Sequence, residues 1–140
     1  MMRIRVLFVF LTFAIFCQGQ DIRNSSNVLL GKVESDGTVR DSNDRQLGKI
    51  ESDGDMRSQN NMFIGKIEND GTIRNAHNVK TGTVESDGTV RDSMNRKVGK
   101  VESDGTVRDS NNRTIGYARG IPATYTAVFF FTEFFPLQTR

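Results

Sequence analysis

Residue types that build reactive sites or cross-link small folds are scarce in this chain. It has one cysteine and one histidine in 140 residues, and the cysteine, Cys17, lies in an N-terminal apolar segment. We expect that segment to be removed, so the mature domain has no disulfide and no thiolate metal site to support it. Its stability must therefore come from the packing of the chain itself.

An excess of basic residues is also missing. The chain has 19 Lys plus Arg and 17 Asp plus Glu. Loss of Arg3 and Arg5 with the N-terminal segment leaves 17 basic residues against 17 acidic ones, a mature net charge of 17 − 17 = 0. A nucleic-acid partner requires a basic excess that displaces phosphate counterions, so we exclude it.

No apolar run is long enough to span a bilayer comfortably. Val6 to Phe16 form an apolar stretch of eleven residues after a basic start, which is typical of a signal peptide at residues 1–19. We predict cleavage after Gly19 and an exported protein, located in the periplasm, at the cell surface or outside the cell. Lipid attachment at Cys17 is the alternative, although Phe16 stands where a bacterial lipoprotein signal has a small residue.

What the chain does have is a repeat of seventeen residues. The phrase GKVESDGTVRDSNDRQL is rewritten with small changes, and each copy opens on a glycine: Gly31, Gly48, Gly65, Gly82, Gly99 and Gly116. Within a copy, Lys32-Val33-Glu34 and Thr38-Val39-Arg40 alternate polar and apolar residues, the period-2 pattern of a strand with one buried face. Each repeat therefore predicts two short strands.

The strands of one repeat are separated by Ser35-Asp36-Gly37. A three-residue hairpin loop with Gly37 at positive φ sets Val33 opposite Val39, so that both point to the same buried side. A two-residue Asp-Gly loop would place these two valines on opposite faces and waste the apolar pattern. We therefore predict the three-residue loop.

The connection between repeats, Asp41 to Arg45, has asparagine or aspartate at its fourth position in every copy, and these residues tolerate a left-handed backbone. Pairing across this turn sets Val39 opposite Leu47. Leu47 and Ile50 then share a face only if a bulge or kink at Gly48 resets the pleat. We expect such a bulge at each repeat glycine.

The two ends of the array are complementary. Ile22 to Asn27 align with the second half of a repeat and Gly116 to Arg119 with the first half, so the last strand can pair beside the first and remove both sheet edges. We predict an all-β closed antiparallel ring, or shallow barrel, near six-fold by its count of strand pairs, with five-fold symmetry and a parallel β-solenoid as the alternatives. The inward positions are all apolar: Ile22, Val33, Val39, Ile50, Met56, Ile67, Ile73, Val84, Val90, Val101, Val107 and Ala118.

These motifs resemble a known family. The DIRNSSN entry segment, the ESDGTVRDSNNRTIG units and the GYARGIP exit are similar to those of the bacterial β-flower proteins over about Gln20 to Phe131. The resemblance implies a shallow four-fold or five-fold ring of short β-hairpins with inward-facing apolar residues. It implies no established activity, cofactor or catalytic residue.

Reactive chemistry has little support in the sequence, and we predict no enzyme, no cofactor and no metal. His77 occupies a turn position that other copies fill with serine, asparagine or methionine, so we interpret it as an exposed turn residue. Ser42 and its equivalents follow aspartates and have no base beside them. The acidic turns reproduce no calcium-loop spacing, so their Asp and Asn residues are expected to stabilise turns.

Two sets of residues are candidates for binding. An arginine recurs in every copy and could form a circle that binds anionic groups of a surface polymer, or could pair with glutamates across the strands: Arg23, Arg40, Arg57, Arg74, Arg91 and Arg108. The C-terminal tail carries the second set: Phe129, Phe130, Phe131, Phe134 and Phe135. This tail could pack over or into the mouth of the ring, contact lipid or a partner, or be poorly ordered; we favour packing against the ring.

The chain is thus divided into a signal peptide (1–19), a hairpin ring (20–119) and an aromatic tail (120–140). We expect an exported, non-enzymatic binding or structural module at the bacterial envelope, with a polysaccharide or lipid as partner. The alternative is an apolar-ligand or membrane-associated protein that uses a central apolar channel and the phenylalanine tail.

Overall fold

The computed structural model describes residues 20–137, and the predicted signal peptide with Cys17 lies outside this range. The described chain forms twelve strands followed by one helix. The strands are β1 (Gln20–Asn24), β2 (Leu29–Val33), β3 (Thr38–Asp41), β4 (Gln46–Ile50), β5 (Asp55–Ser58), β6 (Phe63–Ile67), β7 (Thr72–Asn75), β8 (Lys80–Val84), β9 (Thr89–Asp92), β10 (Lys97–Val101), β11 (Thr106–Asp109) and β12 (Thr114–Tyr117); the helix is α2 (Ala123–Phe131).

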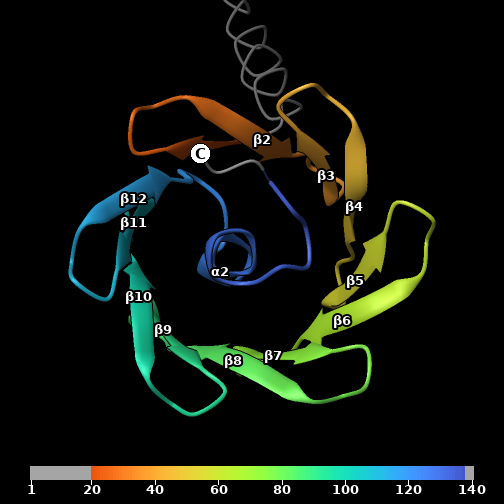
Figure 1. The fold of residues 1–140 in the computed structure, drawn as a ribbon. Helices are drawn as coiled ribbons and strands as arrows, with labels where there is room; N and C mark the ends of the chain where they lie inside the picture. Colours follow the sequence, from red (N-terminus) through yellow and green to blue (C-terminus); the bar gives the residue numbers. More distant parts are fainter. Residues whose placement is uncertain (1–19, 138–140) are drawn as a thin grey trace, which may run out of the picture.

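The twelve strands close into a ring in which every neighbouring pair is antiparallel (Figure 1). The closure is made by β1 and β12, where Arg23 pairs with Tyr117 and Asn24 with Gly116. Six strand pairs and a closed antiparallel ring were predicted, and both are confirmed; the parallel solenoid is wrong. Five tight Gly-containing turns join strands within repeats, whereas the junction of β12 with β1 is held by noncovalent contacts.

The turn within each repeat has the predicted geometry. The Glu34 N–H donates to the Thr38 carbonyl at 2.8 Å, and Gly37 has φ +94°. Val33 consequently pairs with Val39. A methyl group on Gly37 would also lie against the carbonyl oxygen of Ile50 in the next repeat, so this turn requires glycine for both its backbone angle and its close approach.

The turn between repeats holds its fourth residue in the left-handed region, as predicted, with Asp44 at φ +70°. The predicted pairing of Val39 with Leu47 is wrong, because Val39 pairs with Gly48. The bulge therefore comes one residue earlier than the pattern suggested and makes Leu47 the extra residue. Leu47 still packs against the buried cluster, since a bulge lets two successive residues face the same side.

The interior of the ring is filled. All twelve predicted inward residues are buried, each with 7% or less of its surface exposed. Helix α2 runs along the axis of the ring, seen end-on in Figure 1, and its Thr126, Ala127 and Val128 are fully buried. This helix has no charged residue, and a helix with no polar face is typically buried in a protein core. The strands surround it. The axis is thus occupied by the chain's own helix.

Candidate functional site

The recurring glycine of each repeat lies on the inner wall of the ring, and at five of the six positions two groups approach it closely. At Gly48, an added methyl group would overlap the carbonyl oxygen of Arg57 on the next strand and would stand 2.6 Å from Cε1 of Phe135. The first neighbour is backbone and cannot rotate away. Glycine is needed here because a strand and an aromatic ring both approach this position closely.

Five of the six repeat glycines have a side chain of the C-terminal segment packed directly on them. We call these inner-wall positions the glycine seats. The occupants follow the ring in order: Phe130 at Gly116, Phe131 at Gly99, Phe134 at Gly65, Phe135 at Gly48 and Leu137 at Gly31. The aromatic tail is therefore matched to the repeat, with one large apolar side chain for nearly every unit.

The sixth seat, at Gly82, is different. Within 4 Å of a methyl group placed there, the described chain offers only backbone atoms of Arg91 and Asp92. The polar pair Thr132 and Glu133 comes between the phenylalanines that fill the seats on either side. Beside this seat is an open cavity of about 420 Å³ whose lining residues are Thr81, Phe131, Thr132, Glu133 and Phe134.

Local geometry explains why this seat stays open. Helix α2 ends at Phe131, and the backbone of the following residue, Thr132, is extended (φ −136°, ψ 178°), while its hydroxyl donates to the Val128 carbonyl. The chain then leaves the axis for the wall, and no side chain of this bend lies within 4 Å of a methyl group placed on Gly82. On the wall, Thr81 stands where other repeats have leucine, isoleucine or valine, and its hydroxyl donates to the Ile73 carbonyl at 3.1 Å.

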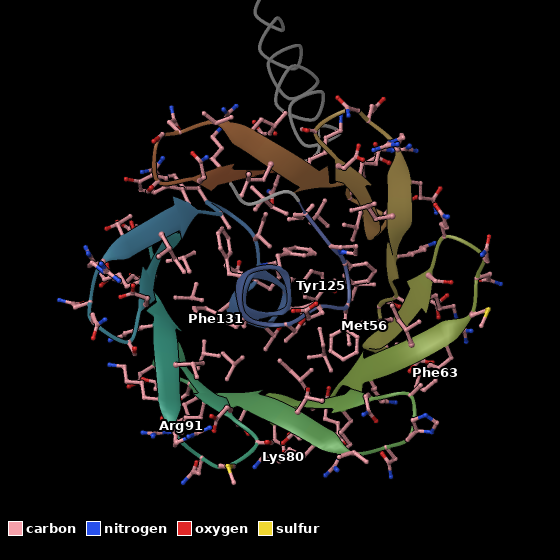
Figure 2. All side chains as sticks on the ribbon, viewed as in Figure 1. Met56, Phe63, Lys80, Arg91, Tyr125 and Phe131 are labelled. Carbon is pink, nitrogen blue, oxygen red and sulfur yellow. The ribbon has the colours of Figure 1, made fainter. Side chains whose placement is uncertain are left out.

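The predicted aromatic residues all lie inside the ring. Phe135 is 1% exposed and Phe129 4%, with ring centroids 6.0 Å apart. Phe130, Phe131 and Phe134 are partly buried against the same cluster, and Figure 2 labels Phe131 on helix α2 inside the ring. No helix among residues 20–137 has the length and apolar content to cross a bilayer. Of the three arrangements considered for the tail, the structure shows packing into the ring.

The arginine column is engaged in pairing. The Nε of Arg40 lies 3.1 Å from Glu34 Oε2, and its Nη1 donates to the Asp44 carbonyl at 3.1 Å. The same glutamate pairing recurs at Arg57, Arg74, Arg91 and Arg108, while Arg23 pairs with Asp21. These arginine side chains are 28–36% exposed. The guanidinium groups thus tie each strand to its neighbour and to the following turn.

We call the outward hairpins that end in the Asn- or Asp-containing turns the petals. In three petals an aspartate opens the turn and an arginine closes it, as with Asp41 and Arg45 at 3.0 Å; the other two pairs are Asp92–Arg96 and Asp109–Arg113. The remaining petals have Asn24, Ser58 and Asn75 at the first position and apolar Val28, Met62 and Val79 at the fifth. All three of these apolar residues are exposed.

One acidic cluster has the composition of a cation site. Oxygens of Glu51, Asp53 and Asp55 lie within 4.8 Å of one another, because Asp55 replaces the threonine of other repeats. Arg57 Nε lies 3.4 Å from Glu51, and Lys66 Nζ lies 3.6 Å from Asp55. These two cations neutralise much of the negative charge, so the cluster fits an ion-pair network better than a metal centre.

The turn aspartates are the groups whose acidity the fold changes. Hydrogen bonds from the Thr38 backbone N–H and then the Thr38 side chain lower the pKa of Asp36, and the same arrangement acts on Asp70, Asp87 and Asp104. The Arg45 backbone N–H lowers the pKa of Asp41, and Asp92 and Asp109 behave alike. His77 is an exposed turn residue, as predicted, and its backbone N–H donates to Asn75 Oδ1 at 2.9 Å.

The architecture defines a class: a closed ring of short antiparallel hairpins with repeated inward apolar residues. A family profile described as "5-fold beta-flower protein" matches residues 19–136, and the chain belongs to that family. The match reaches past the ring into the segment that fills the seats. No curated protein and no solved structure matches the chain. Although the family is described as five-fold, this ring has twelve strands in six hairpins.

Proposed function

We propose that the protein is an exported, non-enzymatic binding or structural module at the bacterial envelope. The observation that carries the proposal is a set of apolar side chains exposed on three successive petals. Met62 is 63% exposed, Phe63 40%, Val79 56% and Met94 72%. Large apolar side chains exposed on neighbouring petals offer a partner several apolar contacts.

The ring suits such a role because it holds its petals rigidly. Each petal turn is fixed by backbone hydrogen bonds, such as that from the Asp44 N–H to the Asp41 carbonyl at 3.0 Å. The petals on β5–β6, β7–β8 and β9–β10 follow one another around the ring, and Figure 2 shows Phe63, Lys80 and Arg91 on this side. A partner with repeated units, such as a polysaccharide, could contact several petals at once and gain affinity by multivalency.

Binding is tested by co-sedimentation of residues 20–140 with peptidoglycan sacculi. The protein is expected in the pellet, and a variant with Met62, Phe63, Val79 and Met94 changed to serine is expected in the supernatant. The matched control changes Arg45 and Arg113 to serine on the β3–β4 and β11–β12 petals and should still sediment. If all three proteins sediment equally and unfold at the same temperature, the exposed apolar residues of the petals do not bind the sacculi.

Export has a separate test. The full chain is expressed in a bacterium, the cells are fractionated, and the N-terminus of the protein is sequenced. A periplasmic or surface protein that starts at Gln20 is expected. A protein that keeps Met1 and stays in the cytoplasm would contradict the proposed location.

The alternative function, a membrane-associated protein, draws support from the five phenylalanines of the tail. Lipid contact through the tail requires α2 and Phe135 to leave the ring, since both are buried there. Flotation of residues 20–140 with phosphatidylglycerol vesicles tests this alternative. Absence of flotation would contradict the membrane-associated alternative.

A further inference from the structure

The glycine seat at Gly82 interrupts a regular pattern. Five seats hold a phenyl or isobutyl group of the same chain, and each occupant would lie within 2.8 Å of a methyl group placed on its glycine. The wall at Gly82 has the same backbone and faces the same axis. Gly82 is itself buried, but no tail side chain of the described residues packs directly on it, and the open space lies beside it, at Thr81.

The cavity at this seat has the size and walls of a ligand site. Its volume of about 420 Å³ falls in the range of small-molecule pockets, roughly 300–1,000 Å³. Phe131 and Phe134, which fill the neighbouring seats, form its apolar walls. The Thr81 and Thr132 hydroxyls already donate to the carbonyls of Ile73 and Val128. An apolar group can thus enter without leaving these hydroxyls unpaired.

The one charged group that lines the cavity is Glu133. Its side chain is exposed, and within residues 20–137 it forms no ion pair. A carboxylate at the edge of an apolar cavity favours a ligand that carries a positive charge next to an apolar body. An anion of the same shape would be repelled.

We propose that the cavity of the fourth repeat binds a small organic cation with a phenyl-sized apolar group, of the arylalkylamine class. The phenyl ring lies between Phe131 and Phe134, against Thr81 beside the Gly82 seat, and the ammonium group contacts Glu133. The site lies on the inner wall, apart from the petals. The proposal for this cavity is therefore independent of the envelope function proposed above, and either can fail without the other.

The experiment is a titration of residues 20–140 with phenethylammonium, followed by NMR. Saturable shifts are expected for the signals of Thr81, Phe131 and Phe134. Titration with 3-phenylpropionate, which has the same ring and a negative charge, should give weaker binding. Absence of saturation, equal affinity for the cation and the anion, or shifts confined to the petals would each overturn the proposal.

Two variants test the contacts. Glu133→Gln removes the charge at an exposed position, and a two- to five-fold loss of affinity for the cation, on the order of an exposed ion pair, is expected. Thr81→Ile restores the residue type of the other repeats, adds volume to the wall and should weaken binding of the cation at least as much. Glu68→Gln, an acid paired with Arg74 on the outer face, is the matched control and should leave affinity unchanged. If Glu133→Gln and Glu68→Gln behave alike, the assigned charge contact is wrong.

Discussion

At the scale of single residues, the repeat glycines do more than reset the strand pleat. The bulge accounts for a local change of register, but it does not by itself forbid a methyl group. The close approach of a backbone carbonyl and of a ring from the tail does, and both come from residues far away in the sequence. Glycine is thus required at these positions for a local reason, the bulge, and for a tertiary reason, the close packing of distant residues.

Replacing a repeat glycine by alanine should cost stability in proportion to what occupies the seat. Gly48→Ala must displace both the Arg57 carbonyl and Phe135, and we expect a loss of about 1–3 kcal/mol in the free energy of unfolding. Gly82→Ala meets only the Arg91 carbonyl, at 2.7 Å, and should cost less. Chemical denaturation of both variants measures the difference. A larger loss for Gly82→Ala would contradict the role of the seats.

The turn aspartates make the stability of the fold depend on pH in the acidic range. Their pKa values are lowered in the folded protein from the ordinary aspartate value of 3.8, so the ionised form stabilises the fold above the unfolded pKa. This contribution is lost as the pH falls through the folded pKa. The midpoint of thermal unfolding should therefore be flat above about pH 5 and drop below about pH 4.

A triple variant isolates one set of these aspartates. Asp41→Asn, Asp92→Asn and Asp109→Asn keep the turn, because Asn24 already accepts the Val28 N–H at 3.0 Å in the equivalent place. The variant should lose less stability than the parent between pH 7 and pH 3. Four other aspartates with a lowered pKa remain, so the slope should decrease rather than vanish. An unchanged slope would show that these three carboxylates do not carry the effect.

At the scale of elements, the C-terminal segment is the core of the ring rather than an appendage. Helix α2 occupies the axis, and the residues after it run along the wall (Figure 1). Because the segment contacts strands of nearly every repeat, it couples units that otherwise contact only their neighbours. The petals have the opposite character, since each is stabilised by its own turn.

Truncating an aromatic residue should therefore reduce the stability of the fold much more in the C-terminal segment than on a petal. Phe135→Ala leaves a cavity beside Phe129 and Gly48, and we expect a loss of about 3–5 kcal/mol in the free energy of unfolding. Phe63→Ala, on an exposed petal, should change it by about 0.5 kcal/mol or less. Denaturant titration of each variant checks this. Equal losses would mean that the tail is not packed as described.

At the scale of the whole molecule, the ring has one seam. β1 and β12 are paired through two residues each, and they come from opposite ends of the ring sequence. The C-terminal segment contacts both sides of this seam, with Phe130 at Gly116 on β12 and Leu137 at Gly31 on β2. The tail therefore closes the ring as well as filling it.

A chain that ends after Gly120 should lose cooperative folding. Removal of α2 exposes the twelve inward apolar residues to water and unfastens the seam, so the sharp thermal transition of residues 20–140 is expected to disappear. Circular dichroism during heating measures this. A chain that ends at Leu137 keeps the described contacts and should unfold cooperatively. A sharp transition in the shorter chain would show that the strands are stable as a ring without their core helix.

The sequence by itself determined the ring. The period, the positive-φ turn residues, the inward valines and isoleucines and the complementary half-repeats are all local signals, and each constrains the backbone within a few residues. Leu47 was placed one position wrongly because a bulge displaces pairing by one residue without changing the apolar pattern. Only the tertiary structure decided what fills the ring, since α2 and its phenylalanines have no repeat of their own to align with the strands. The glycine seats bring the repeat glycines together with side chains of the C-terminal segment, except at Gly82. These contacts join residues far apart in the sequence, so they depend on packing across the axis of the ring and not on local sequence.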